Sequence, residues 1–293
     1  MNKEKIKAWI QASRPPFFIA TLIPILIGWL MAKGSGWNGG RLILVLVACF
    51  VVHFVTNIAN DYFDYIQGTD SGKAIGGSRV IQQDKITPTQ LGWAIIGLYF
   101  IGFIISLYIV FGLKLYGLAP LILFAFFSSL FYVAPPIRYG YHGLGELFVA
   151  MNMGPIMVVG TYWVIAGKPG WDAFFVSVPV GLMVASILYY QSLPDMYTDE
   201  AAGKRTLAVR LGKQGAFFVL IVWLAIIYLT IIILVASGLL SWLSLLSLLT
   251  LPIFLKLIRI IRGTEDWVLL DQYGKYVRML YFFNGLAIIL GVI

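Results

Sequence analysis

The chain has 293 residues, of which 60% are hydrophobic and only 12% are charged. Because a soluble domain carries about 25% charged residues, this composition excludes a water-soluble globular protein and predicts one embedded in a lipid bilayer. The formal net charge of +8 is explained by the membrane topology argued below, and it does not indicate a nucleic-acid partner.

Nine apolar segments follow one another along the chain. A transmembrane helix needs about 20 mostly apolar residues. The runs are continuous rather than alternating, which favours a helical bundle over a β-barrel. We therefore expect an all-α membrane protein, with nine transmembrane helices in one domain covering residues 1–293. The segments are residues 16–32, 42–60, 90–112, 116–134, 145–167, 173–193, 215–237, 240–261 and 276–293.

The distribution of lysine and arginine orients these segments, because cytoplasmic loops carry an excess of both residues. With the N-terminus in the cytoplasm, all but four of the 21 Lys and Arg residues fall on the cytoplasmic side. The exceptions are Lys33, Arg41, Lys114 and Lys168. We expect an integral, multi-pass protein of a prokaryotic cell membrane with a cytoplasmic N-terminus.

Two polar loops, at about residues 61–89 and 194–214, follow the second and sixth segments and both face the cytoplasm in this orientation. They lie four segments apart, which indicates two four-helix halves with a ninth helix added. The active site is therefore expected at the cytoplasmic side. The one cysteine, Cys49, excludes a disulfide framework and a cysteine-based zinc site.

The first loop begins with "NDYFDYIQGTD". Asp61 and Asp64 are three residues apart and share a face if the second segment continues as a helix. Asn57 lies one turn before Asp61 on that face. Such a cluster of acids and amides is unusual at the end of so apolar a segment, and it marks a candidate site.

The second loop contains "LPDMYTDEAAGKRTLAVRLG", in which Asp195 and Asp199 are four residues apart. Two carboxylate pairs on helix ends at one membrane face suit Mg²⁺, which prefers oxygen ligands and often bridges to substrate phosphates. Solvated loop acids are the simpler interpretation of a single pair. The duplication favours a catalytic and metal-binding role for Asp61, Asp64, Asp195 and Asp199.

Basic residues accompany both motifs and indicate a diphosphate ligand, because cations can hold phosphate oxygens that a metal leaves uncovered. The alternative is that these residues only set the topology. Asn152, within the fifth segment, is costly in lipid unless it faces the bundle interior, and it is a candidate pocket residue. The candidate diphosphate-binding residues are Lys73, Arg79, Arg138, Lys204 and Arg205.

At these motifs the chain resembles the UbiA superfamily of intramembrane prenyltransferases, whose motifs are usually N-D-x-x-D-x-x-x-D and D-x-x-x-D. Here they read Asn60-Asp61-x-x-Asp64 and Asp195-x-x-x-Asp199. The resemblance includes "SRP" at residues 13–15, "GKRTLAVRLG" and the nine-segment layout, and so covers essentially the whole chain. The form "DYFDYxxGxD" looks like the menaquinone branch, which prenylates 1,4-dihydroxy-2-naphthoate.

The resemblance implies a polyprenyl diphosphate donor, Mg²⁺ and an aromatic acceptor within the bilayer. Asn57 and Asn60 would help the four aspartates to hold the metal against the diphosphate. The allylic C–O bond would then ionise, and an electron-rich ring would capture the carbocation. Arg14 would pair with the carboxylate of the acceptor, and Asn152 would line its site. An apolar tunnel between helices would take the isoprenoid tail.

Two departures from the pattern leave the acceptor open. The third acid of the first motif falls at Gly68, with Asp70 two residues later, and "YYQSLPD" replaces an Asn-Asn…Arg-Asp run that is frequent in the menaquinone branch. The alternatives are 4-hydroxybenzoate, haem, another tetrapyrrole or a glycerol-phosphate lipid as acceptor, a terpene cyclase, and a secondary transporter. The sequence leaves the prenyl chain length and the oligomeric state open.

Overall fold

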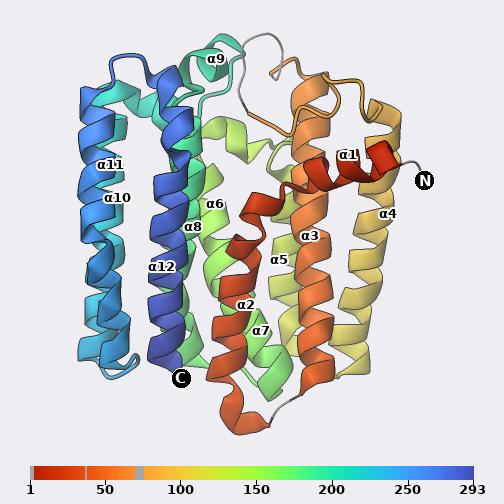
Figure 1. Cartoon of the computed structure of the whole chain (residues 1–293). Helices are drawn as coiled ribbons and strands as arrows, with labels where there is room; N and C mark the ends of the chain where they lie inside the picture. Colours follow the sequence, from red (N-terminus) through yellow and green to blue (C-terminus); the bar gives the residue numbers. More distant parts are fainter. Residues whose placement is uncertain (1–2, 37, 70–75) are drawn as a thin grey trace.

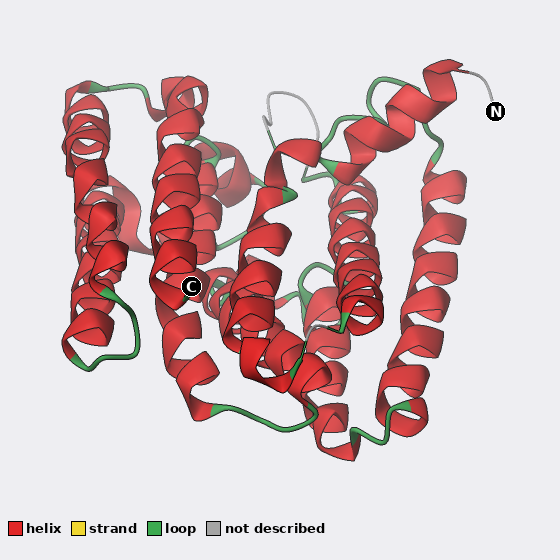
Figure 2. Cartoon of the chain, turned by 60° about the horizontal axis from the view of Figure 1, so that its bottom comes forward, coloured by secondary structure: helices red, strands yellow, loops and turns green. Residues whose placement is uncertain are grey.

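The computed structural model describes residues 3–36, 38–69 and 76–293 of the chain, and these parts are helical with no strand (Figures 1 and 2). Short 3₁₀ and π turns connect or extend the α-helices. The α-helices are α1 (Lys3–Ser13), α2 (Ile19–Met31), α3 (Gly39–Ile66), α4 (Pro88–Leu107), α5 (Ala119–Phe131), α6 (Gly145–Met151), α7 (Met157–Ala166), α8 (Trp171–Ser192), α9 (Met196–Ala201), α10 (Leu207–Ala236), α11 (Leu251–Gly263) and α12 (Gly274–Val292).

Seven helical segments of the described chain are long and apolar enough to cross a bilayer. An eighth is added if α1 and α2, which are bent by 56° at their junction, count as one span, and the apolar helix Tyr116–Phe131 is shorter. The chain is therefore an all-α, multi-pass membrane protein, as predicted. The seven segments are Gly39–Ile66, Pro88–Gly112, Gly145–Ala166, Trp171–Ser192, Leu207–Ala236, Trp242–Gly263 and Trp267–Val292.

The two polar loops lie at the same end of the bundle. α3 and α8 run in the same direction, so that the chain leaves α3 and enters α9 at the end that also carries α1 (Figure 1). α3 stays helical to Ile66 and therefore presents Asp61 and Asp64 on its last turns, as the spacing predicted. The second motif lies on α9, with Asp195 as its N-cap residue.

α8 forms the centre of the bundle, because 72% of its apolar window is buried inside the protein. It packs against α6, α10 and α12. It lies close to the end of α6 and to the helical turn Asn152–Ile156: a Cβ added at Gly154 would lie 2.7 Å from the carbonyl oxygen of Ser177, and a Cβ at Gly181 would overlap the carbonyl of Ala150. Small residues allow such close contact between membrane helices.

Gly181→Ala should therefore lower the free energy of unfolding by about 3 kcal/mol, since the added methyl group cannot fit without moving a backbone. Gly97→Ala on α4 is the matched control, because no atom lies within 4 Å of a Cβ added there. Thermal unfolding of both variants in detergent checks this expectation. Equal melting temperatures would contradict the close helix contact.

Candidate active site

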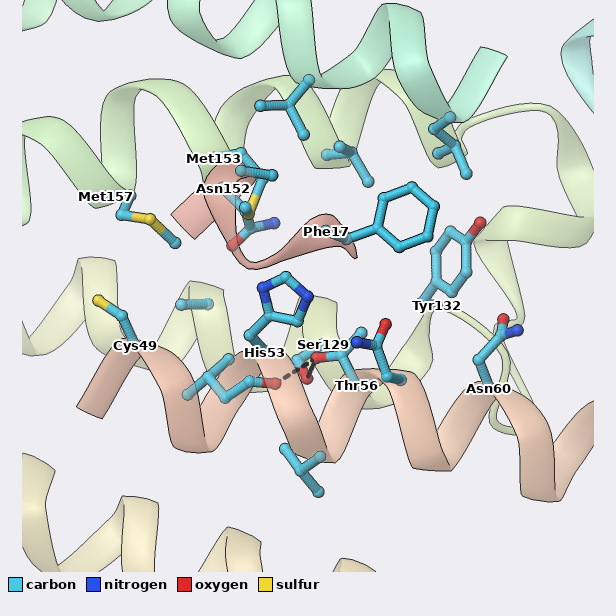
Figure 3. A pocket seen from close by; sticks show the side chains of 18 of the residues that line it. Phe17, Cys49, His53, Thr56, Asn60, Ser129, Tyr132, Asn152, Met153 and Met157 are labelled. Carbon is cyan, nitrogen blue, oxygen red and sulfur yellow. Dashed lines mark hydrogen bonds between the residues drawn. The ribbon is translucent and has the colours of Figure 1, made fainter. Parts of the chain in front are cut away.

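A cavity of about 440 Å³ runs into the bundle from the end that carries both acidic motifs. At that end it is bordered by Asp64, Asp195, Asp199 and Lys204, and deeper by apolar side chains such as Val45. Figure 3 shows Tyr132 and Asn60 at one end of the cavity and Cys49 and Met157 at the other. The cavity therefore joins a charged mouth to an apolar interior.

Asp64 is buried on the last turn of α3 and is held by groups from other elements. The hydroxyl of Tyr141, in the loop after α5, donates to Asp64 Oδ1 over 2.5 Å, and the same hydroxyl lies 2.7 Å from Thr69 Oγ1. The backbone N–H of Thr69 donates to the carbonyl oxygen of Asp64 over 2.9 Å. These contacts fix the first motif while its second carboxylate oxygen, Oδ2, faces Lys204.

Lys204 lies between the two acidic motifs. Its Nζ is 3.5 Å from Asp199 Oδ1 and 3.9 Å from Asp64 Oδ2. The Lys204 backbone N–H also donates to the carbonyl oxygen of Asp199 over 2.8 Å, which anchors the residue at the end of α9. The ammonium lies 5.3 Å from the centroid of the Tyr141 ring. One cation thus bridges carboxylates that are far apart in the sequence.

The electrostatics of this end reflect burial and close charges. Burial raises the pKa of Asp199 to about 6, against the opposing effect of Lys204. Burial alone would lower the pKa of Lys204, but Asp64 and Asp199 outweigh it and hold that pKa above its usual value. Burial, followed by the charge of Asp64, raises the pKa of Tyr141. The mouth of the cavity therefore stabilises positive charge strongly.

Asp61 is placed differently from Asp64. Arg14 forms an ion pair with Asp61 Oδ1, the Ser78 N–H donates to the same oxygen over 3.0 Å, and the Ser78 hydroxyl donates to Oδ2. Within the described residues, Asp64 borders the cavity and Asp61 does not. Asp61 therefore ties the start of the protein and the loop after α3 to the last turns of that helix.

Three of the predicted basic residues have strained backbones. Arg14, Arg79 and Arg138 have φ values of 55°, 63° and 43°, in the left-handed region. Such a conformation costs a non-glycine residue about 1–3 kcal/mol, and it persists where the surrounding structure holds it, often at functional sites. Only two other non-glycine residues of the described chain have positive φ, Asp84 and Lys114.

Arg138 and Arg205 lie beside the mouth and not in the described cavity wall. Arg138 Nη1 donates to Gln67 Oε1 over 2.7 Å, and its guanidinium lies 5.7 Å from the centroid of the Tyr141 ring. The Arg205 backbone N–H donates to the carbonyl oxygen of Tyr141 over 2.9 Å, while its side chain is exposed. Lys73 and Asp70 lie outside the described residues.

The three predicted asparagines border the cavity. Asn57 Nδ2 donates to the carbonyl oxygen of Ser13 over 3.1 Å, and Asn60 lies one turn before Asp64. Asn152 is deeper, where Nδ2 donates to the carbonyl oxygen of Phe148 over 2.7 Å and to Ser128 Oγ over 2.9 Å. Asn152 therefore lies inside the bundle, where an amide has hydrogen-bond partners.

Several site residues were not predicted. Tyr141 and Ser78 bond the two aspartates of α3, and Glu146 is a buried acid in the cavity wall. The sequence signal for Glu146 was a lone acid at the start of an apolar segment, which resembles an ordinary interfacial charge. Tyr141 and Ser78 carry no signal of their own, because only the folded loops bring them to the motifs.

The donor set fits a hard cation such as Mg²⁺. Among the described residues, no group of three or more His, Cys, Asp or Glu side chains converges closely enough to hold a metal alone. Asp64 and Asp199 nevertheless already share one cation, the ammonium of Lys204. Mg²⁺ takes oxygen ligands, keeps several waters and is commonly completed by substrate phosphates, so that two or three carboxylates and a diphosphate would suffice.

Comparison with known proteins adds to this geometry. A model of the UbiA prenyltransferase family matches residues 21–270. A 1,4-dihydroxy-2-naphthoate octaprenyltransferase of Haemophilus influenzae is 29% identical over 265 residues, which cover 87% of this chain and 86% of that protein. A 2-carboxy-1,4-naphthoquinone phytyltransferase of Synechocystis is 29% identical over 293 residues, which cover 97% of this chain and 92% of that protein.

A solved structure shares the fold. The structure of a UbiA homolog from Archaeoglobus fulgidus bound to GPP and Mg²⁺ aligns with a TM-score of 0.64 at 14% identity, covering 96% of this chain and 99% of that chain. At that identity the likeness shows the fold alone.

Proposed function

Since the chain belongs to the UbiA prenyltransferase family and is therefore a prenyltransferase, we propose that it transfers a polyprenyl group from polyprenyl diphosphate to 1,4-dihydroxy-2-naphthoate. The observation that carries this proposal is the meeting of Asp64, Asp199 and Lys204 at the mouth of an otherwise apolar cavity. A diphosphate with a long hydrocarbon tail has the same two-part character. The family excludes the secondary transporter considered from the sequence.

The donor diphosphate binds at the mouth. Asp64, Asp195 and Asp199 border the cavity there and would hold Mg²⁺, assisted by Asn57 and Asn60. Mg²⁺, when bound, neutralises the diphosphate as it leaves. Asp61 contributes by fixing Arg14 and Ser78 beside the site.

The cations of the mouth hold the outer oxygens of the diphosphate. Lys204 is already in the cavity wall, so it turns from the carboxylates to the phosphate when the donor binds. Charge-assisted hydrogen bonds of this kind stabilise the leaving group as the allylic C–O bond breaks. The other residues proposed to bind the diphosphate are Lys73, Arg79, Arg138 and Arg205.

The isoprenoid tail lies in the deep part of the cavity. Side chains from α3, α5 and α7 form its apolar wall, among them Val45, Leu121 and Met157. This environment excludes water, so that the carbocation meets the acceptor ring before it meets a hydroxide ion or water. Tyr132 and Phe17 also border the cavity, and their ring faces can stabilise positive charge.

The acceptor enters beside the mouth. The Haemophilus relative is named for 1,4-dihydroxy-2-naphthoate, which supports this acceptor over 4-hydroxybenzoate, a tetrapyrrole or a glycerol-phosphate lipid. Arg14 and Asn152 border the cavity and are the proposed acceptor contacts. Loss of the acceptor carboxylate as CO₂ restores the aromatic ring after transfer.

The proposed topology has nine crossings in two four-helix halves plus one, with α2 and α5 completing the seven longer spans. The N-terminus and both motifs face the cytoplasm of a prokaryotic cell, as the Lys and Arg distribution predicts. The protein then takes its water-soluble acceptor from the cytoplasm and its donor from the bilayer.

Product analysis tests this function. Purified protein in detergent is given geranylgeranyl or farnesyl diphosphate, Mg²⁺ and either 1,4-dihydroxy-2-naphthoate or 4-hydroxybenzoate. We expect a prenylated, decarboxylated naphthol from the first acceptor only, and no product when EDTA replaces Mg²⁺. A prenylated 4-hydroxybenzoate, or a cyclised hydrocarbon from donor alone, would contradict the proposed reaction.

A further inference from the structure

Glu146 is a buried acid of the cavity wall with no part in the donor site described above. It lies in the first turn of α6 and is 4% exposed. Its carboxylate accepts a hydrogen bond from its own backbone N–H, and in the described parts of the chain it makes no hydrogen bond or ion pair with another side chain. One backbone N–H leaves most acceptor positions of this buried carboxylate unfilled, which is costly, and this indicates that a ligand of the cavity supplies the remaining partner.

Aromatic rings share the cavity wall with this acid. A Cβ added at Gly145, the preceding residue, would lie 3.2 Å from the ring of Tyr132, so that glycine lets this ring pack directly against the start of α6. The centroids of Tyr132 and Tyr139 are 5.5 Å apart, and those of Tyr139 and Phe148 are 4.1 Å apart in a stack. A flat aromatic ligand fits beside such a wall.

The charged groups that face Glu146 place it close to the donor mouth but separate from it. The ammonium of Lys204, from the loop after α9, attracts the Glu146 carboxylate electrostatically. The same carboxylate interacts electrostatically with the hydroxyls of Tyr132, at the end of α5, and Tyr189, on α8. Lys204 makes its ion pairs with Asp64 and Asp199, and it makes none with Glu146 in the described parts of the chain. An acceptor between Glu146 and the donor would therefore touch both.

We propose that Glu146 is a catalytic base that takes the proton of an acceptor ring hydroxyl during transfer; this inference rests on the function proposed above. The ring carbon that carries the carboxylate forms the bond to the prenyl group while the C–O bond to diphosphate breaks. The neighbouring hydroxyl gives its proton to Glu146 and becomes a carbonyl. The bond to the carboxylate then breaks, CO₂ leaves, and its electron pair rebuilds the ring.

The proton returns from Glu146 to the ring oxygen in this last step. One donor and one acceptor thus give one prenylated naphthol, one CO₂ and one diphosphate, with no net change in Glu146. The hydroxyl is a stronger electron donor as its proton moves away, so the base accelerates capture of the allylic cation. General bases of this kind contribute about 10²–10⁴-fold.

The test compares Glu146→Gln with the wild-type protein and with Glu200→Gln, an exposed acid on α9. Product formation and diphosphate release are measured with geranylgeranyl diphosphate, Mg²⁺ and 1,4-dihydroxy-2-naphthoate between neutral and alkaline pH. We expect Glu146→Gln to lower kcat for transfer about 100-fold at neutral pH and to recover as pH rises, because the acceptor hydroxyl then ionises by itself. The other titratable groups near Glu146, which are Tyr132, Tyr189 and Lys204, are the same in the variant and the wild type, so a new pH dependence comes from the loss of Glu146.

Diphosphate release from the donor alone should stay within about twofold of wild type, because ionisation does not use the base. Glu146→Asp, which keeps a carboxylate, should retain part of the rate without the new pH dependence. Equal transfer by Glu146→Gln and wild type, or an equal loss of donor-only release, would overturn the inference. A wild-type protein that forms no prenylated naphthol would instead contradict the proposed function.

Discussion

Asp64→Asn and Asp199→Asn should each reduce prenyl transfer on the order of 10³-fold, since each removes one charge from the end of the cavity that receives metal and diphosphate. The substitution keeps the shape of the side chain. In Asp64→Asn the amide oxygen can still accept the hydrogen bond from Tyr141, whose hydroxyl lies 2.5 Å from Asp64 Oδ1. The loss should therefore appear in diphosphate release as well as in product, with the protein still folded.

Asp84→Asn is the matched control for these variants. Asp84 is exposed, and its φ of 53° is a conformation that asparagine accepts. We expect its transfer rate to stay within about twofold of wild type, as for most surface substitutions. Size-exclusion profiles and melting temperatures establish folding. Transfer that survives Asp64→Asn or Asp199→Asn would mean that the acidic motifs have another role.

Asp61 shows where sequence spacing stops being informative. Residues three apart on a helix differ by about 60° around its axis, so Asp61 and Asp64 share a face in the broad sense that the spacing predicted. The rotation of α3 within the bundle then decides which side chain faces the cavity. That rotation depends on packing against α2, α4 and α5, which no local pattern contains.

The helices themselves follow closely from composition. Long apolar runs in a bilayer must form helices because every backbone group needs an internal partner, and the segment predicted at 90–112 is found at Pro88–Gly112. A clear difference is at α10, predicted from 215 and found from Leu207. Its first residues precede Gly212, where φ is 64°, and Arg210, Lys213 and Gln214 flank that glycine, so hydropathy did not include them.

Glu146 was missed for a physical reason. A single carboxylate at the start of an apolar segment usually lies at the membrane surface, and "GLGELF" has no spacing that distinguishes a surface acid from a buried one. It is buried because α6 starts inside the bundle, against α8 and the loop that contains Tyr139. Tertiary packing alone turns this acid into a candidate catalytic group.

Lys204→Met should lower kcat/KM for the prenyl donor about 100-fold, because a hydrogen bond to a charged group is worth about 1.5–3 kcal/mol. The KM for the acceptor should change little, since its proposed contacts are elsewhere. Lys275→Met is the control, because that exposed cation lies over Tyr276 on the surface. Steady-state kinetics with each substrate varied in turn check the expectation. A loss confined to acceptor binding would contradict the proposed position of Lys204.

The same variant separates the two roles of this lysine. Without metal, Lys204 is the cation shared by Asp64 and Asp199, and removing one partner of a buried charge cluster is strongly destabilising, by about 3–5 kcal/mol. Lys204→Met should therefore melt earlier than wild type in EDTA. Mg²⁺ should raise its melting temperature more than that of wild type, because the ion replaces the missing charge between the carboxylates. An equal effect of Mg²⁺ on both proteins would mean that the metal binds away from Lys204.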